Sequence, residues 1–129
     1  MKRVTGIGGV FFKTPNPANS REWYNKHLGI ESSQYGAVFE WLQKDNPTKE
    51  GNTAWNPFPA DTQYFNPSKQ EFMINYRVEN LEALLVLLKE EGVTIVGDME
   101  SFDYGKFAWI MDSDGNKIEL WEPVDEELK

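Results

Sequence analysis

The sequence contains no cysteine and only one histidine, His27. Without cysteine the chain cannot form a disulfide, offers no thiolate nucleophile and has no Cys-ligated zinc site. This composition fits the cytoplasm, which is the compartment we expect. His27 lies near the end of a predicted helix, and no motif supports a Ser-His-Asp triad around it.

Long apolar runs and an excess of basic charge are also missing. No run of about 18 apolar residues occurs, so no membrane-spanning helix is expected. The chain has 13 basic and 21 acidic residues, which gives a net charge of -8. Nucleic acids and anionic membranes both attract basic surfaces, so neither is expected as a partner.

The residues that are present suit one globular domain. The 129 residues are 40% hydrophobic and 14% aromatic, which is enough to bury a core. No stretch has the composition of a flexible linker. We therefore expect a single domain over residues 1–129.

In the first half, strand and helix signals follow one another closely. Residues 4–14 form a strand candidate, and Asn16 and Pro17 then mark the start of a helix that Gly29 ends. Three more strands are expected at residues 35–43, 53–58 and 62–65.

The second half repeats this order. A strand is expected at 72–78, and Asn80 caps a helix over 81–91 that stops at Gly92. An extended segment begins at 93–96, and Asp114-Gly115 joins strands 106–111 and 117–121 as a hairpin. A shift of 64 residues superimposes the two halves and places Asn16 on Asn80. We interpret this as two βαβββ modules, about 4–66 and about 72–124.

The strands of both modules have one apolar face and one mixed face. Successive side chains of a strand alternate between faces, so Gly9, Phe11 and Lys13 oppose Val10 and Phe12. We expect the apolar faces to lie beneath the helices and the mixed faces to line a concavity. The alternative is an open sheet whose second face meets water. The candidate ligand-pocket residues are Phe11, Trp55, Met73, Asn75, Arg77, Glu119 and Trp121.

Three segments in this order resemble the vicinal oxygen chelate superfamily, which includes glyoxalases, extradiol dioxygenases and bleomycin-resistance proteins. They are residues 16–29, residues 76–81 and, most specifically, the closing segment DSDGNKIELW at 112–121. The resemblance covers nearly the whole chain. It implies an α+β fold whose two modules form one cup-shaped mixed sheet, and it implies a homodimer.

The sequence departs from the superfamily at its metal positions. Metal-dependent members place a histidine on the first strand of each module and a glutamate on the last strand. The corresponding residues here are Gly9, Met73 and Glu119, and Gln63 is a loose candidate for a further oxygen. A catalytic metal normally needs three or four protein ligands. Set against the superfamily's metal site, these changes leave too few ligands, so we expect neither a metal ligand set nor a cofactor. A divalent metal is disfavoured.

Glu119 remains the candidate catalytic residue. An aromatic neighbour such as Phe11 or Trp121 would desolvate its carboxylate and let it act as a metal-free base. The alternative is a structural ion pair with Lys13, Arg77 or Lys117.

Two further features have open interpretations. Lys13 and Arg77 occupy matching repeat positions and would form a cationic rim for a carboxylate or phosphate, or else they are ordinary surface charges. The aromatic stretch 55–59 lines the cup, packs in the core or contacts a second copy.

The sequence therefore favours a small-molecule-binding protein of the glyoxalase or bleomycin-resistance type, without the usual metal and with an unidentified organic ligand. The alternative is a lyase, isomerase or dioxygenase of the same superfamily that uses Glu119 with an atypical metal site or none. A third hypothesis is a subunit whose cup is filled and only structural.

Overall fold

The computed structural model describes residues 2–125; Met1 and residues 126–129, which the predicted domain also contains, lie outside this range. The elements follow the order β1 (Val4–Thr14), α1 (Pro17–Leu28), β2 (Ala37–Leu42), β3 (Glu50–Pro59), β4 (Phe72–Val78), α2 (Leu81–Glu90), β5 (Glu100–Phe102), β6 (Gly105–Met111) and β7 (Lys117–Pro123). This is the expected α+β fold class, with one mixed sheet and two helices in the described part of the chain. No helix within residues 2–125 is long and apolar enough to cross a membrane.

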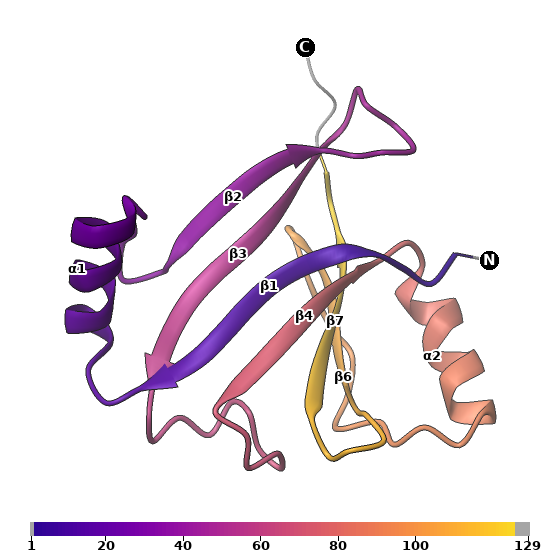
Figure 1. The fold of residues 1–129 in the computed structure, drawn as a ribbon. Helices are drawn as coiled ribbons and strands as arrows, with labels where there is room; N and C mark the ends of the chain where they lie inside the picture. The colour runs from indigo at the N-terminus through magenta and orange to yellow at the C-terminus, as the bar shows by residue number, and fades with distance from the viewer. Residues whose placement is uncertain (1, 126–129) are drawn as a thin grey trace.

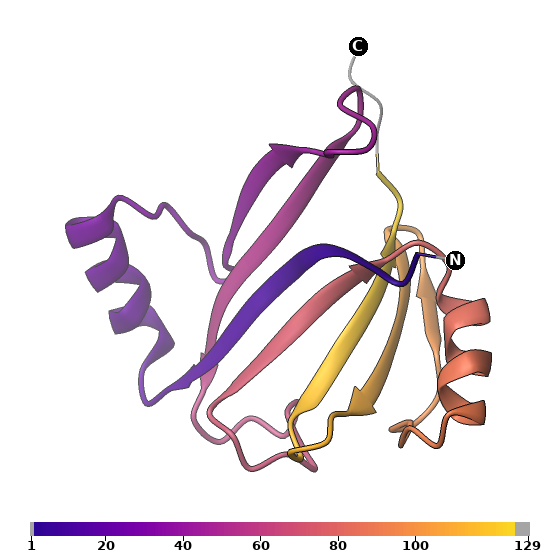
Figure 2. The same cartoon turned by 45° about the vertical axis from the view of Figure 1, so that its right-hand side comes forward.

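The seven strands form one sheet in the order β2-β3-β1-β4-β7-β6-β5. At its centre β1 runs antiparallel to β4, while β3 is parallel to β1 and β7 is parallel to β4. Each module therefore contributes its first and last strands to the middle of the sheet. Figures 1 and 2 show α1 and α2 at the two ends of this curved sheet.

The two helix starts have the same geometry, as the 64-residue repeat predicts. Asn16 and Asn80 both have φ -144°, with ψ 92° and 94°. Each side chain accepts a hydrogen bond three residues on, from the backbone N–H of Asn19 at 3.1 Å and of Ala83 at 3.2 Å. These caps satisfy backbone donors that would otherwise be orphaned in the first turn of each helix.

The expected strand at 62–65 is wrong. This segment lies in a series of turns between β3 and β4, so the first module contributes only β1, β2 and β3 to the sheet. Phe65 packs there as a fully buried core residue. The apolar side chains of this segment therefore bury a turn against the sheet and do not mark a paired strand. In the second module the short β5 follows the extended segment at 93–96, which contributes only an isolated bridge between Ile95 and Ile110.

Two hydrophobic clusters lie on opposite faces of the sheet. The first fills the space beneath α2 and includes Leu84, Ala108 and Leu120. The second consists of Phe65, Met73 and Trp109, with Phe11, Phe58, Val96 and Phe107 packed against it. The predicted alternation of faces is confirmed, since odd-numbered side chains of β4 and β7 lie on the side away from α2. This second face is called the cup face below.

Candidate functional site

A buried polar row crosses the cup face at the middle of the sheet. Gly9 on β1 is the cross-strand partner of Asn75 on β4, and Asn75 is the partner of Glu119 on β7. Trp109 on β6 completes the row, because the β6–β7 hairpin places it opposite Glu119. The 64-residue repeat aligned Gly9 with Met73, but Asn75 is the residue that lies between Gly9 and Glu119.

The Glu119 carboxylate accepts hydrogen bonds from three side chains. The Asn75 amide nitrogen donates to Oε1 at 2.6 Å, and the Trp109 indole N–H donates to Oε2 at 2.9 Å. The Tyr64 hydroxyl also donates to Oε2. Glu119 is 3% exposed and Asn75 is 2% exposed. A buried charge needs such partners, so this network accounts for a carboxylate at the centre of the sheet.

Tyr64 belongs to the turn segment between β3 and β4 and closes the network on the solvent side. Burial, assisted by the negative charge of Glu119, raises the pKa of the Tyr64 hydroxyl far above its ordinary value of 10.0. The hydroxyl therefore keeps its proton and donates it in the hydrogen bond to Glu119. Gln63, the residue before Tyr64, is exposed, and its amide oxygen accepts a hydrogen bond from the Asn66 side chain.

An open depression lies over this network. It has a volume of about 370 Å³ and is lined by Tyr64, Gly97, Asp98, Glu100, Trp109 and Lys117. The Tyr64 and Trp109 rings meet nearly perpendicularly, with centroids 6.3 Å apart. The Lys117 ammonium lies 5.3 Å and 5.7 Å from these two ring centroids and donates to the Tyr64 carbonyl at 2.7 Å. Burial lowers the pKa of Lys117, and the charge of Glu119 partly offsets that effect.

The remaining predicted pocket residues have different surroundings. Met73 is fully buried in the second cluster, and the Phe11 ring lies 5.4 Å from that of Phe58. Trp55 lies on the other face of the sheet, where its ring is 5.5 Å from Phe12 and 5.0 Å from Tyr24 of α1. The structure therefore brings Phe11, Met73, Asn75, Arg77, Glu119 and Trp121 to the cup face and places Trp55 beneath α1.

Lys13 and Arg77 do not form a cationic rim together. Arg77 is the partner of Gly6, whereas Lys13 lies at the far end of β1, with its ammonium over the Phe65 ring. Arg77 pairs with Asp125 instead. None of the ion pairs found within residues 2–125 involves Glu119, so the structural ion pair with Lys13, Arg77 or Lys117 is wrong.

The residues of this row do not fit the metal site of the superfamily. Among residues 2–125, no group of three His, Cys, Asp or Glu side chains is arranged to hold a metal ion. Both oxygens of Glu119 are already used by three donors. A side chain at Gly9 would meet the Phe11 ring at 2.7 Å from its Cβ, so a ligand there has no space. Hard divalent ions prefer several oxygen ligands free to coordinate, and this row offers none.

Sequence reasoning missed two of the three donors to Glu119. The contact of Trp109 could have been predicted, because a hairpin that turns at Asp114-Gly115 pairs residue 111 with 117 and hence 109 with 119. Tyr64 gave no such signal, because its segment is held by turns and by burial of the adjacent Phe65 rather than by periodic pairing.

Comparison with known proteins identifies the fold. No family model matches the sequence, and no curated protein matches it. Methylmalonyl-CoA epimerase from Mycobacterium tuberculosis aligns with 96% of this chain and 91% of its own at 21% identity, with a TM-score of 0.63. A Streptomyces coelicolor methylmalonyl-CoA epimerase in complex with 2-nitronate-propionyl-CoA aligns with 98% of this chain and 99% of its own, at 15% identity and a TM-score of 0.70.

A metal-bound protein shares the fold as well. The Mn(II)-bound glyoxalase from Novosphingobium aromaticivorans aligns with all of this chain and 42% of its own, at 14% identity and a TM-score of 0.64. Epimerases and glyoxalases of these kinds belong to the vicinal oxygen chelate superfamily. At these identities the likeness shows the fold, so the chain has the cup-shaped fold of that superfamily.

Proposed function

We propose that this chain is a small-molecule-binding protein of the glyoxalase or bleomycin-resistance type, folded as one domain, and that it binds its ligand without a metal ion. One observation carries the proposal: Tyr64 and Trp109, which line the open depression, are also donors to the buried Glu119 carboxylate. The solvent-facing hollow and the polar row beneath it therefore form one continuous site. Ligand sites commonly combine aromatic walls with a few fixed polar groups.

The lining favours an organic molecule with a planar part and an acceptor group. The Tyr64 and Trp109 rings provide two apolar walls at nearly 90°. The Lys117 ammonium has three donors, of which the Tyr64 carbonyl takes one, so it can also donate to a ligand. The depression, at about 370 Å³, is large enough for a small acid or an acyl group, but not for a complete coenzyme A thioester.

A thermal-shift screen tests this proposal. The compounds are small organic acids, planar aromatics and methylmalonyl-CoA, which the epimerase neighbours suggest as a probe, together with Mg²⁺, Mn²⁺ and Zn²⁺. We expect a compound that raises the melting temperature of the wild type and of Trp23→Phe, a control at an exposed tryptophan on α1. The same compound should bind at least tenfold more weakly to Tyr64→Ala and Lys117→Ala. Binding that these two changes leave intact would contradict the site.

An enzyme that uses Glu119 without a metal is the second candidate. The observation in its favour is that the carboxylate accepts hydrogen bonds directly from two residues that line the depression, Tyr64 and Trp109. Mass spectrometry of each bound compound after incubation with wild type and Glu119→Gln separates the two functions. A binder leaves the compound unchanged and retains its affinity in the variant within several fold. An enzyme converts it, and the variant loses at least about 100-fold in rate.

We also propose a homodimer in the cytoplasm. The face of β1 and β4 between the two helices exposes Ile7 (48%), Val10 (38%) and Phe72 (40%). Side chains of this kind gathered on neighbouring strands favour contact with a second copy. Sedimentation equilibrium measures the assembly directly, and a mass of 14.9 kDa at micromolar concentration would contradict the dimer.

A further inference from the structure

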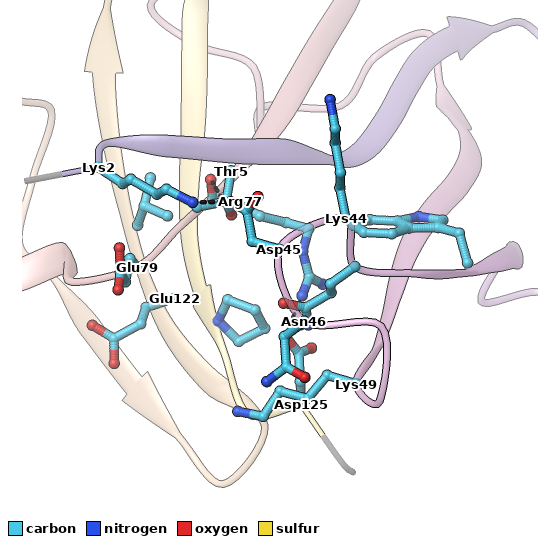
Figure 3. A pocket seen from close by; sticks show the side chains of 14 residues that line it. Lys2, Thr5, Lys44, Asp45, Asn46, Lys49, Arg77, Glu79, Glu122 and Asp125 are labelled. Atoms are coloured by element: carbon cyan, nitrogen blue, oxygen red, sulfur yellow. Dashed lines mark hydrogen bonds and ion pairs between the residues drawn. The ribbon is translucent and has the colours of Figure 1, made fainter. Parts of the chain in front are cut away.

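A second cavity lies at the end of the sheet where β4 and β7 finish. Its volume is about 390 Å³, and its lining contains four basic and four acidic residues. Figure 3 shows that the lining residues come from the β2–β3 connection, from the start of the chain and from the ends of β4 and β7. This cavity shares no lining residue with the depression over Glu119.

Arg77 forms the floor of this cavity as a buried and permanent cation. Its side chain is 3% exposed, and its guanidinium carbon lies 5.1 Å from the Trp41 ring centroid and 5.3 Å from that of Trp121. The two rings fix the guanidinium plane and exclude water from its faces. Arg77 Nη1 also donates to the Asn52 carbonyl at 3.4 Å, but a neutral carbonyl does not balance the charge. Such a buried cation requires an anion beside it.

The anion in this structure is the carboxylate of Asp125. Arg77 Nη2 forms an ion pair with Oδ2 of Asp125, and the Gln43 amide nitrogen donates to the same oxygen at 2.8 Å. Two donors, one on β4 and one directly after β2, thus converge on one carboxylate oxygen. Asp125 itself lies outside the sheet, two residues beyond the end of β7 at Pro123. Arg77 lies in β4 and Gln43 directly follows the end of β2, whereas the carboxylate that they bind belongs to neither strand.

The charges of the lining lead to the same conclusion. Among the lining residues that the structure describes, four acids face four bases, and removal of the Asp125 carboxylate leaves one more base than acid. Without Asp125, the buried Arg77 would lack an anion beside it. A free carboxylate supplies the same charge, the same planar geometry and the same acceptor atoms as Asp125.

We infer that Arg77 and Gln43 form a carboxylate-binding site, which the chain's own Asp125 occupies and from which a small carboxylic acid displaces it. The inference does not rest on the proposed function, because the two cavities are separate. A tethered side chain acts at an effective concentration in the millimolar range, so the wild type should bind small carboxylates at least tenfold more weakly than a chain without Asp125.

Chemical rescue of Asp125→Ala tests the site. This change leaves Arg77 buried without an anion, and we expect the melting temperature to fall by about 5 °C or more. Sodium acetate or sodium succinate at about 50 mM should restore at least half of that loss, while sodium chloride of equal ionic strength should not. The wild type should gain less than about 1 °C from the same additions.

Two control variants make the result specific. Asp45→Ala removes an acid from the same lining, but one whose side chain is 70% exposed, and carboxylates should not raise its melting temperature. The double change Arg77→Met with Asp125→Ala removes both charges and should also be insensitive to carboxylates. If Asp125→Ala does not fold, Asp125→Asn keeps an acceptor toward Gln43, and its indole ¹⁵N–¹H signals from Trp41 and Trp121 should shift with acetate. The absence of rescue and of those shifts, or equal rescue of Asp45→Ala, would overturn the inference.

Discussion

Replacement of Glu119 by glutamine or alanine perturbs the centre of the cup face with a minimal change elsewhere. The glutamine side chain has nearly the same shape but no charge, and its NH₂ group cannot accept a hydrogen bond. The Asn75 amide oxygen is buried and has no partner in the present network. If the Asn75 amide turns over in Glu119→Gln, its oxygen can accept from the new NH₂ group. Tyr64 and Trp109 then keep an oxygen acceptor, but one without charge.

The cost follows from the three hydrogen bonds. Hydrogen bonds to a charged group contribute roughly 1.5 to 3 kcal/mol each, and neutral ones roughly 1 kcal/mol. Glu119→Gln replaces all three charged bonds by neutral ones, at roughly 0.5 kcal/mol or more each, and should lower the free energy of unfolding by about 2 kcal/mol. Glu119→Ala leaves the buried donors of Asn75 and Trp109 without an acceptor, while the partly exposed Tyr64 can turn to water. That change should cost about 4 kcal/mol.

Urea denaturation followed by tryptophan fluorescence measures both losses, with unchanged m-values expected. For a domain of this size they correspond to falls in melting temperature of about 7 °C and about 14 °C. Glu100→Gln is the matched control, because Glu100 is an exposed carboxylate on the rim of the same depression. It should change stability by less than about 0.5 kcal/mol. A loss below about 1 kcal/mol in Glu119→Ala, or equal losses at both glutamates, would refute the reasoning.

Three more predictions concern other contacts of the fold. Gly8→Ala should lower the free energy of unfolding by about 2 kcal/mol, because the new Cβ would lie 2.2 Å from the buried Asn75 amide oxygen. Gly6→Ala is the control, because its Cβ would lie 3.3 Å from the nearest atom, on the edge of the Trp41 ring. It should cost less than half as much in the same urea titration. The raised pKa of Tyr64 means that the folded chain holds a proton that the unfolded chain loses above about pH 10, so stability should fall above that pH, and fall less in Tyr64→Phe; identical pH profiles would contradict this. The pKa of Asp112 is lowered by hydrogen bonds to its carboxylate, chiefly from the backbone N–H of Asn116, so the stability it adds is present above about pH 3.8 and lost below it. The difference between wild type and Asp112→Ala should therefore shrink as the pH falls from 6 to 2, and a constant difference would count against this assignment.

Most of the fold could be predicted because its signals are local. Asn16, Pro17 and Gly29 each set a backbone conformation at one end of α1, and the same holds for Asn80 and Gly92 around α2. The alternation along β4 and β7 likewise identified the two faces correctly. Where the structure of a segment depends on distant partners, as in the turns around Phe65, residue patterns imitate a strand and the prediction is wrong.

The candidate site could be predicted only in part. Alternation placed Asn75 and Glu119 on one face, but alternation does not reveal what lies above that face. The Tyr64 hydroxyl comes from a turn segment, and the Asp125 carboxylate comes from beyond the last strand. Both contacts depend on the path of irregular chain segments across the cup face, which no periodicity encodes. The prediction for Trp55 failed for another reason: its position in an aromatic stretch does not tell which face of β3 it occupies.

The most direct test of a metal-free ligand site is NMR spectroscopy of protein labelled with ¹⁵N-tryptophan. The Trp109 indole N–H donates to Glu119 beneath the depression, whereas Trp23 lies exposed on α1, so their indole signals report the site and a control surface in one spectrum. Trp109→Phe and Trp23→Phe assign the two signals. The account predicts that an organic compound from the thermal-shift screen moves the Trp109 signal and leaves that of Trp23 in place, while equimolar Mg²⁺ or Zn²⁺ moves neither. A saturable shift of the Trp109 signal with one equivalent of a divalent ion would contradict the account.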